Sequence, residues 1–269
     1  MNPITYCLNT STIRPTPFPD KIRIAAAAGF TAIEPWNDEV TALELAGESV
    51  AEIRKLIEDA GLRVPSMIAL HGWTAPDGEE YRRALEECKR RMDQAAALGC
   101  PTIVASPPPG DIDLTLAADR FGDLVALGKE VGVTPSMEFL GFVSKVHTLD
   151  SAWRIVEHCG FPDLPIVADV FHLLRGGGSL DELLRVPGDR ISIFHINDLP
   201  QVPPYIAQTD ADRVMLGEGT ADLPRVVKNL RTIGYRGPVS LELFNRALWE
   251  SDPGEVCRVG LARMKALFG

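Results

Sequence analysis

The segment Ile191-Ser192-Ile193-Phe194-His195 is a short apolar run that ends in a side chain able to bind a metal ion. Three more runs in the second half of the chain have the same form: Pro135-Ser136-Met137-Glu138, Ile166-Val167-Ala168-Asp169 and Val239-Ser240-Leu241-Glu242. An unpaired charge at the end of a buried strand is costly, so each of these residues needs a partner. Because they recur once per predicted strand, they predict that the strand ends meet around one ion.

Short apolar runs alternate with longer amphipathic runs along the whole chain. Strands are predicted at Ile4–Leu8, Ala32–Pro35, Val64–Ala69, Thr102–Ala105, Thr134–Phe139, Ile166–Val170, Ile191–Ile196 and Val239–Leu243. Helices are predicted between them at Pro19–Ala28, Ser49–Ala60, Glu79–Leu98, Leu114–Val131, Leu149–His158, Ser179–Arg185, Leu223–Ile233 and Pro253–Leu267. Strand–helix units of roughly thirty residues each predict one domain over residues 1–269, a single (β/α)₈ TIM barrel of the α/β class.

Glycines mark where these helices end and the next strands begin. A left-handed residue commonly closes a helix, and the candidates are Gly29, Gly61, Gly99, Gly132, Gly160 and Gly234. Asp20 is placed to cap the first helix. The alternative fold is a doubly wound open sheet. That fold is disfavoured because the segment Leu8-Asn9-Thr10-Ser11-Thr12 lacks the glycine-rich phosphate turn expected after its first strand.

Composition and charge argue against several classes of function. The chain has a formal net charge of −10 and no concentrated block of Lys and Arg, which disfavours binding to nucleic acid or to an anionic membrane. No apolar run approaches the length needed to span a bilayer. The 5 cysteines have no paired spacing, and no N-terminal stretch resembles a signal peptide. We therefore expect reduced thiols and a cytoplasmic protein.

The four strand-end residues have the chemistry of a metal site. The carboxyl ends of barrel strands meet at one face, so Glu138, Asp169, His195 and Glu242 are predicted to be neighbours. Without a cation, the three carboxylates would repel one another and some would take up protons. Three oxygen donors and one imidazole suit one divalent ion, with Mn²⁺ expected first and Mg²⁺, Co²⁺ or Zn²⁺ as alternatives. The competing interpretation is that each acid pairs with an arginine or caps a neighbouring helix.

Further polar side chains near the strand ends are candidates for binding a substrate: Asn9, Glu34, Trp36, His71, His172, Asp198 and Arg213. Trp36 and Trp73 are expected to form an aromatic wall of the kind that holds sugar rings, or else to fill the core. Asp198 is expected to hydrogen-bond the His195 imidazole or a substrate hydroxyl. Arg213 lies in the irregular segment Asn197–Gly219, which has the length of a functional loop.

Several of these segments resemble the motifs of one family, the sugar phosphate isomerase/epimerase group, whose members are xylose isomerase-like TIM barrels. The similar segments are Gly29–Glu34, Met137-Glu138, Ala168–His172, Phe194–Asp198, Leu216–Gly219 and Ser240–Asn245, and the resemblance runs from the first strand to the last helix. Within the group, Asp210–Gly219 and Leu243-Phe244-Asn245 look most like the 2-keto-myo-inositol (inosose) isomerases.

The resemblance implies a metal-dependent isomerase or epimerase that acts on a keto-sugar or keto-inositol in carbohydrate metabolism or inositol catabolism. Glu138 and Glu242 would be its catalytic base and acid, on opposite sides of a hydroxyketone, with a metal-stabilised enediolate between the two proton transfers. His172 would contact a substrate oxygen or orient a metal ligand. By analogy with related barrels, a homo-oligomer is also expected.

Three other functions stay open at this point. The same enediolate can expel a beta substituent, which would make the protein a dehydratase or a keto-glycoside lyase. A DNA-repair endonuclease of the related barrel type needs a histidine-rich centre and a basic groove, which 5 histidines and a charge of −10 disfavour. A non-catalytic sugar-binding barrel is less expected, because none of the four predicted metal ligands is missing.

Overall fold

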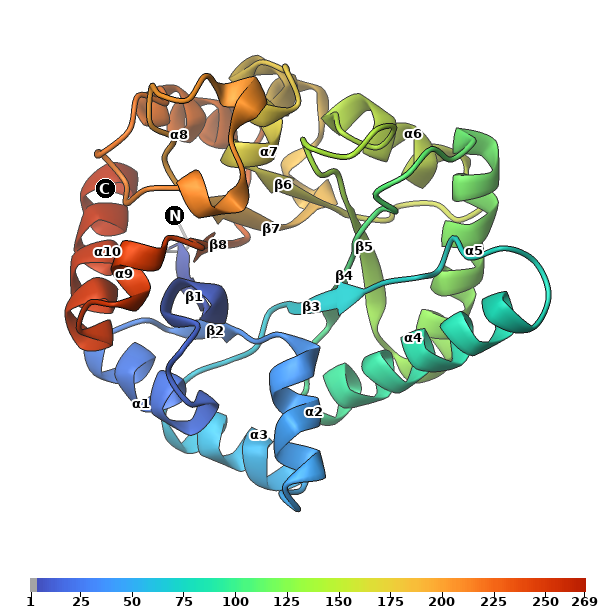
Figure 1. The fold of residues 1–269 in the computed structure, drawn as a ribbon, viewed down its shortest axis with the longest axis horizontal. Coiled ribbons are helices and arrows are strands. Elements are labelled where there is room, and N and C mark those ends of the chain that lie inside the picture. Colours follow the sequence, from blue (N-terminus) through green and yellow to red (C-terminus); the bar gives the residue numbers. More distant parts are fainter. Residues whose placement is uncertain (1–3) are drawn as a thin grey trace.

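Parallel strands form the centre of the molecule in the computed structural model, which describes residues 4–269. They are β1 (Thr5–Asn9), β2 (Ala32–Glu34), β3 (Met67–Leu70), β4 (Thr102–Ala105), β5 (Thr134–Glu138), β6 (Ile166–Asp169), β7 (Ile191–Ile196) and β8 (Pro238–Leu241). Their order is β2-β1-β8-β7-β6-β5-β4-β3. Trp36, just after β2, bridges to Ile68 in β3, and the Ile68 N–H donates to the Pro35 carbonyl over 3.1 Å. The sheet therefore closes on itself, which confirms the predicted barrel (Figure 1).

Helices surround this barrel on its outside (Figure 1). Their bounds are α1 (Phe18–Ala28), α2 (Asn37–Leu45), α3 (Val50–Asp59), α4 (Glu79–Ala97), α5 (Leu114–Val131), α6 (Leu149–His158), α7 (Val170–Arg175), α8 (Leu223–Thr232), α9 (Arg246–Trp249) and α10 (Pro253–Phe268). Helices α5 and α6 have the predicted bounds, because a polar cap before each one, Asp113 or Thr148, fixes its start. Short 3₁₀ segments lie at η1 (Thr10–Ile13), η2 (Leu180–Arg185), η3 (Gly188–Arg190), η4 (Tyr205–Ala207) and η5 (Asp210–Asp212).

Several local predictions are wrong. The segment Ser179–Arg185 forms the 3₁₀ turn η2 where an α-helix is predicted. Asp20 lies inside the first turn of α1, because Pro17 precedes the helix and Phe18 begins it. Helices α2, α7 and α9 are not predicted at all. Helices α7 and α9, with 6 and 4 residues, are too short to show a helical period, and each begins at a side-chain cap, from Asp169 or Asn245. Helix α2 has 9 residues but buries only Asn37 and Val40, so it has no continuous apolar face.

Glycine closes the helices as predicted. All six of the glycines named above have a positive φ, between 73° and 95°. At Gly29, with φ 95°, the N–H donates to the Ala26 carbonyl and the chain turns directly into β2. A residue with a side chain would be strained at that backbone conformation.

The strands are buried on both faces, which explains their continuous apolar runs. Inside the barrel, small and branched side chains form one cluster: Cys7, Ala32, Ile68, Ala69, Val104, Val167 and Ile193. A second and larger cluster fills the space between the strands and the helices. All 5 cysteines are buried free thiols. The apolar interior gives way to polar side chains at the carboxyl ends of the strands, so that end holds the candidate site.

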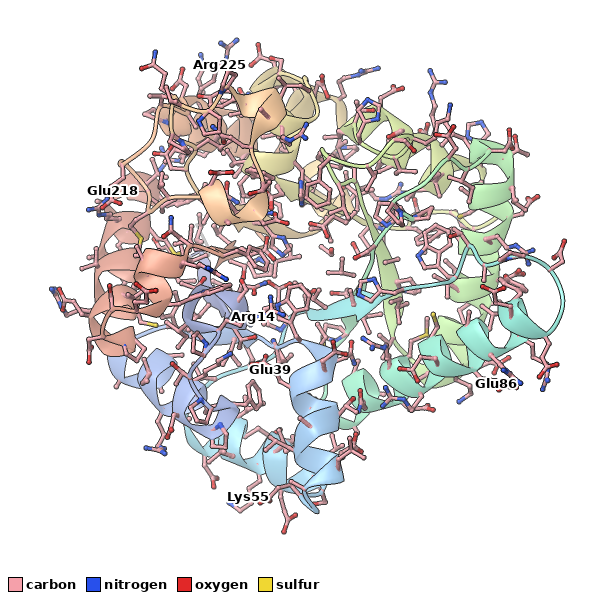
Figure 2. All side chains as sticks on the ribbon, viewed as in Figure 1. Arg14, Glu39, Lys55, Glu86, Glu218 and Arg225 are labelled. Atoms are coloured by element: carbon pink, nitrogen blue, oxygen red, sulfur yellow. The ribbon has the colours of Figure 1, made fainter. Side chains whose placement is uncertain are left out.

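Many charged side chains lie on the surface of the molecule. Lys55, Glu86 and Arg225 lie on the outer rim, whereas Arg14 and Glu39 lie nearer the middle of the molecule (Figure 2). Within residues 4–269, no helix combines the length and apolar character of a membrane-spanning segment.

Candidate metal centre and active site

The carboxyl ends of β5, β6, β7 and β8 bring the four predicted metal ligands together. Glu138 and Asp169 are the last residues of β5 and β6, His195 lies in β7, and Glu242 directly follows β8. Strand register places Asp169 opposite His195. The same register places His195 opposite Ser240, two residues before Glu242. Asp169 and His195 are 26 residues apart along the chain, and Glu138 and Glu242 are 104 residues apart. The parallel strands bring all four to one site.

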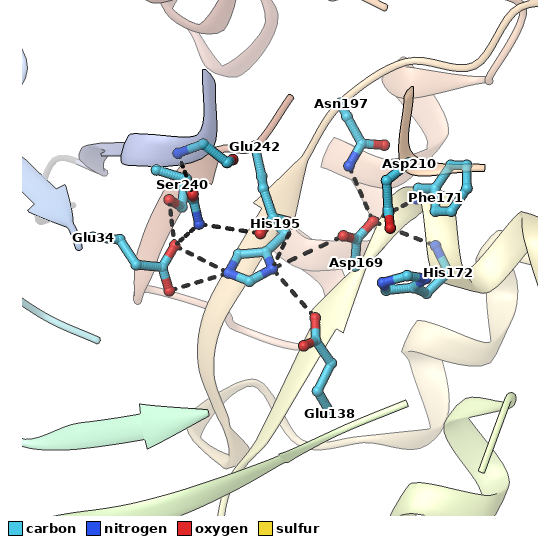
Figure 3. A network of polar contacts seen from close by, with 12 residues as sticks. Glu34, Glu138, Asp169, Phe171, His172, His195, Asn197, Asp210, Ser240 and Glu242 are labelled. Atoms are coloured by element: carbon cyan, nitrogen blue, oxygen red, sulfur yellow. Dashed lines mark hydrogen bonds and ion pairs between the residues drawn. The ribbon is translucent and has the colours of Figure 1, made fainter. Parts of the chain in front are cut away.

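The imidazole of His195 faces three carboxylates with one nitrogen. His195 Nδ1 lies 3.2 Å from Glu242 Oε2, 3.4 Å from Glu138 Oε1 and 3.9 Å from Asp169 Oδ2. This nitrogen is buried and has no hydrogen-bond partner within residues 4–269. Donor atoms that share a divalent ion at about 2.1 Å are spaced by roughly 3 to 4 Å. Donor atoms of Asp169, His195 and Glu242 lie within 4.8 Å of one another, as do those of Glu138, Asp169 and His172, so these side chains could hold a divalent cation (Figure 3).

Burial makes the charges of this cluster costly. Burial, with the charges of Glu242 and Asp169 adding to it, raises the pKa of Glu138 to about 7, although His195 opposes the shift. Burial also raises the pKa of Glu242. Burial would raise the pKa of Asp169 too, but Arg213, His172 and His195 outweigh it and lower that pKa. Glu138 and Glu242 thus resist ionisation next to Asp169, which is ionised. A bound cation would favour the ionised form of all three carboxylates.

Glu34 contacts His195 on the Nε2 side of the ring, opposite the other three carboxylates, and is not accessible to a substrate. Its carboxylate lies 3.1 Å from His195 Nε2 and accepts hydrogen bonds from Asn9 Nδ2 (2.9 Å) and Ser240 Oγ (2.8 Å). The side chain has no exposure. A carboxylate on the second nitrogen fixes the ring of a metal-binding histidine and leaves Nδ1 free for the ion. The expected substrate contact of Glu34 is therefore corrected to a role in orienting His195.

Asn9 connects Glu34 to the ligands. Besides its bond to Glu34, Asn9 Nδ2 donates to Glu242 Oε1 over 3.1 Å, and its Oδ1 accepts from the indole nitrogen of Trp36 over 3.1 Å. Asn9 has no exposure, whereas Trp36 is half-buried. Of these two predicted substrate residues, Trp36 retains a surface that a ligand can reach.

Arg213 reaches the centre from the long segment after β7. Its Nη1 donates to Asp169 Oδ2 over 2.7 Å and to Glu242 Oε2 over 2.8 Å, and its Nη2 donates to Asp210 Oδ1 over 2.6 Å. The guanidinium lies over the rings of Phe171 and Phe244, with centroids 4.5 and 5.2 Å away. These contacts pair Asp169 and Glu242 with an arginine, as the competing interpretation of the sequence expects for those two acids, and contact of Arg213 with a substrate stays a prediction.

His172 lies next to Arg213 and is held neutral. Its Nδ1 accepts a hydrogen bond from the Gly141 N–H over 3.2 Å, and its Nε2 lies 3.2 Å from Arg213 Nη2. Burial, helped by the charge of Arg213, lowers the pKa of His172 to about 4 although Asp169 opposes the shift. At neutral pH the uncharged imidazole can form a hydrogen bond with a substrate oxygen.

Two predicted substrate residues lie elsewhere. Asp198 accepts hydrogen bonds from four backbone N–H groups, those of Leu199, Gly217, Gly219 and Ala221, at 2.8 to 3.1 Å. It therefore anchors the loop that carries Arg213 and does not bind His195. His71 is exposed, and its charged neighbours are Arg91 and Asp38. Trp73 is fully buried and donates to the Ser106 carbonyl over 2.8 Å, so it fills the core.

Two residues that support the ligands are not predicted from the sequence. Asn197 Nδ2 donates to Asp169 Oδ1 over 3.0 Å, and Ser240 holds Glu34 as described. Each lies two positions from a ligand, Asn197 after His195 and Ser240 before Glu242. Alternate residues of a strand point to the same face, so this spacing is the signal that identifies them.

Comparisons relate the chain to known proteins. Residues 22–267 match the model of the xylose isomerase-like TIM barrel family. The chain is 26% identical to inosose isomerase of Bacillus velezensis, over 97% of this chain and 96% of that protein. It is 27% identical to 3-dehydroshikimate dehydratase of Pseudomonas putida over 84% of this chain, but spans only 36% of that longer protein. Its fold is similar to the crystal structure of the IolI protein with a bound zinc atom, with a TM-score of 0.91 and 23% identity over 98% of each chain.

Proposed function

The chain belongs to the xylose isomerase-like TIM barrel family, and we propose that it is a divalent-metal-dependent isomerase or epimerase of a keto-sugar or keto-inositol. The observation that supports this most is the unpartnered Nδ1 of His195 facing Glu138, Asp169 and Glu242. The similarity to an inosose isomerase over nearly its whole length supports the choice of a cyclic polyhydroxy ketone.

Glu138, Asp169, His195 and Glu242 would hold the ion. When bound there, a divalent ion would supply a positive charge that polarises a substrate carbonyl and offsets the negative charge on its oxygen. The oxygen-rich donor set supports Mn²⁺, and the zinc atom of the similar IolI structure makes Zn²⁺ the first alternative to test. Glu34 keeps the His195 ring oriented for this task.

The two glutamates are the proposed proton carriers. Glu138 and Glu242 keep 5% and 4% of their surface exposed, whereas Asp169 and His195 keep none, so the glutamates are the ligands nearest to the opening of the site. Glu138 removes the proton from the hydroxyl-bearing carbon next to the carbonyl. In an isomerisation, Glu242 delivers a proton to the former carbonyl carbon, and the hydroxyl proton of the first carbon passes to the former carbonyl oxygen. In an epimerisation, Glu242 delivers the proton to the opposite face of the first carbon.

Arg213 and His172 are the proposed contacts for the substrate oxygens. Arg213 supplies a fixed positive charge beside the position where oxygen charge develops, and its stacking on Phe171 and Phe244 limits its movement. His172, neutral because of its low pKa, adds a hydrogen bond without a second charge.

A dehydratase is the second candidate function, and the match to 3-dehydroshikimate dehydratase favours it. The first step is the same removal of a proton beside a carbonyl. The electron pair then expels the beta hydroxyl group as water, with an acid supplying its proton, and no proton returns to carbon.

The experiment follows proton exchange by NMR in D₂O with the purified protein and Mn²⁺. The compounds are keto-inositols, ketohexoses, 3-keto-glycosides and 3-dehydroshikimate. Deuterium incorporation with otherwise unchanged mass supports isomerisation or epimerisation, and loss of water or of an aglycone supports elimination. Binding without exchange in every compound would contradict both reactions and leave a sugar-binding barrel.

We further propose that the enzyme works in the cytoplasm on a small molecule, since its 5 cysteines are buried free thiols. Assembly into a homo-oligomer is also proposed, and light scattering on the purified protein measures it.

A further inference from the structure

A row of aromatic rings and cations crosses the mouth of the barrel away from the candidate metal centre. It begins at Arg213, whose guanidinium lies 5.2 Å from the Phe244 ring. Phe244 packs edge-on against Trp36 with centroids 5.9 Å apart, and the Arg14 guanidinium lies 5.8 Å from the Trp36 ring. The row therefore connects the reaction centre to a second arginine, Arg14, which is exposed.

A cavity of about 270 Å³ lies at the far end of this row, between η1 and α2. Its lining includes Ser11, Arg14, Trp36 and the pair formed by Lys21 and Glu39. Figure 2 shows Arg14 and Glu39 close to the middle of the molecule, on the inner side of the helical ring. The cavity is thus next to the candidate site, separated from the ligands by Trp36 and by Asn9, to which Trp36 donates.

The charges of the cavity leave one cation without a carboxylate. Lys21 and Glu39 neutralise each other across 2.5 Å. Asp38, which also lines the cavity, pairs with Arg91 across 2.8 Å. Arg14 forms no ion pair with any residue in the described part of the chain, from 4 to 269. The four charged residues that line the cavity, Arg14, Lys21, Asp38 and Glu39, sum to zero, and Arg14 is the one among them without an ion pair within residues 4–269.

A second polar group in the cavity lacks a partner. Ser11 is 2% exposed, and its hydroxyl has no hydrogen bond within residues 4–269. A buried hydroxyl without a partner costs free energy, so a ligand that accepts a hydrogen bond from it would recover that cost. Ser11 lies in the 3₁₀ segment η1, Arg14 directly follows that segment, and both line the same cavity.

We propose that this cavity binds an anionic group at the end of the substrate remote from its carbonyl, a carboxylate or a phosphate. This inference rests on the proposed function and narrows its substrates to keto-sugars or keto-cyclitols that carry such a group. Arg14 pairs with the anion, the Ser11 hydroxyl donates to it, and the carbon skeleton passes Trp36, which lines the cavity on the side of the candidate metal centre. The candidate metal centre already holds three carboxylates, so an anionic group is better placed at Arg14 than at that centre.

The experiment compares compounds that differ only in the anionic group. Ribulose 5-phosphate is paired with ribulose, and 3-dehydroshikimate with its methyl ester. Binding to the Mn²⁺-loaded protein is measured by calorimetry, and deuterium exchange is measured separately by NMR. We expect at least one anionic member to bind about tenfold or more tightly than its uncharged partner, and the pair that shows this distinguishes phosphate from carboxylate.

Three variants test the residues. Arg14→Gln should weaken binding of the preferred anion about tenfold and leave its uncharged partner within about twofold, and Arg14→Lys should restore part of the loss. Ser11→Ala should weaken the same anion about threefold to tenfold without lowering thermal stability. The matched control is Arg23→Gln, because Arg23 is exposed on α1 and pairs with Asp20 outside the cavity.

The inference is overturned if neither anionic member binds better than its partner, or if Arg14→Gln weakens both members of a pair equally. Failure of the proposed function gives a different result. In that case anionic selectivity and its loss in Arg14→Gln are seen by calorimetry, but no compound exchanges deuterium.

Discussion

The carboxyl ends of β5 to β8 and those of β3 and β4 lie on the same face of the barrel but are built differently. Each of the first group delivers a buried ionisable side chain to a common point: Glu138, Asp169, His195 and Glu242. The second group does not: His71 after β3 is exposed, Trp73 is core, and β4 runs into Ser106-Pro107-Pro108-Pro109. Proximity to a strand end alone is thus a weak sign of function.

Burial explains the difference. A charged group at a buried strand end costs several kcal/mol unless something compensates it, so its presence implies a partner or an ion. A buried tryptophan such as Trp73 or an exposed histidine such as His71 has no such cost, because the first fills the core and the second is solvated. Substitutions in each group test whether chemistry is confined to the first group of strand ends.

The largest expected effect follows Glu138→Gln. This change keeps the shape of the side chain and removes the proposed base, so turnover in the NMR assay should fall by about 10²- to 10⁴-fold. Thermal stability without added metal should stay the same or rise, because one of three crowded carboxylates is lost. The matched control is Glu86→Gln on the exposed surface of α4, which should change neither. An unchanged rate in Glu138→Gln would refute the assignment of the base.

A smaller effect is expected at Glu34 and Ser240, which support a metal ligand without binding the ion. Glu34→Gln removes the carboxylate from His195 Nε2, and Mn²⁺ affinity measured by calorimetry should fall about 10- to 100-fold. Ser240→Ala, which removes one donor to Glu34, should give a smaller loss in the same direction. Equal metal affinity in Glu34→Gln and the unmodified protein would show that Glu34 does not orient the ligand.

Metal affinity should also depend on pH. Burial raises the pKa of Glu138 to about 7, so below that pH a proton must leave before its carboxylate can bind an ion. Burial would lower the pKa of His195, but Glu242 and Glu34 raise it well above its usual range, so His195 releases another proton. Glu242, whose pKa burial also raises, adds to this release, so Mn²⁺ affinity should rise with pH and should rise more steeply below pH 7 than above it.

Calorimetry between pH 6 and 8, in buffers with different heats of ionisation, counts the protons released. In Glu138→Gln the slope below pH 7 should fall by about one, because the proton of Glu138 is no longer involved. An affinity that does not change with pH would contradict the coupling between these groups and the ion.

The smallest effect is expected at the other group of strand ends. His71→Ala should change kcat/KM by less than about twofold, since the side chain is exposed and has only Arg91 and Asp38 as charged neighbours. A loss of tenfold or more would show that the end of β3 faces the substrate, and the contrast between the two groups would then be wrong.

Local patterns in the sequence predict the barrel well. Apolar runs such as Ile191–Ile196 and amphipathic runs such as Leu114–Val131 have periods that the backbone itself imposes, and both appear with the predicted bounds. The glycines that end helices are predicted for the same reason, because a positive φ is a local requirement. Short elements such as α7 escape prediction because six residues contain too little of a period.

By itself, the sequence determined the order of strands and helices, and it marked four ionisable residues whose burial is costly. Only the tertiary structure decided what each neighbouring polar residue does. Glu34 and His195 are 161 residues apart and meet over 3.1 Å, while Asp198, three residues from His195, turns away to hold a loop. A local period fixes which face of a strand a side chain occupies, but its partner depends on how distant strands are packed side by side.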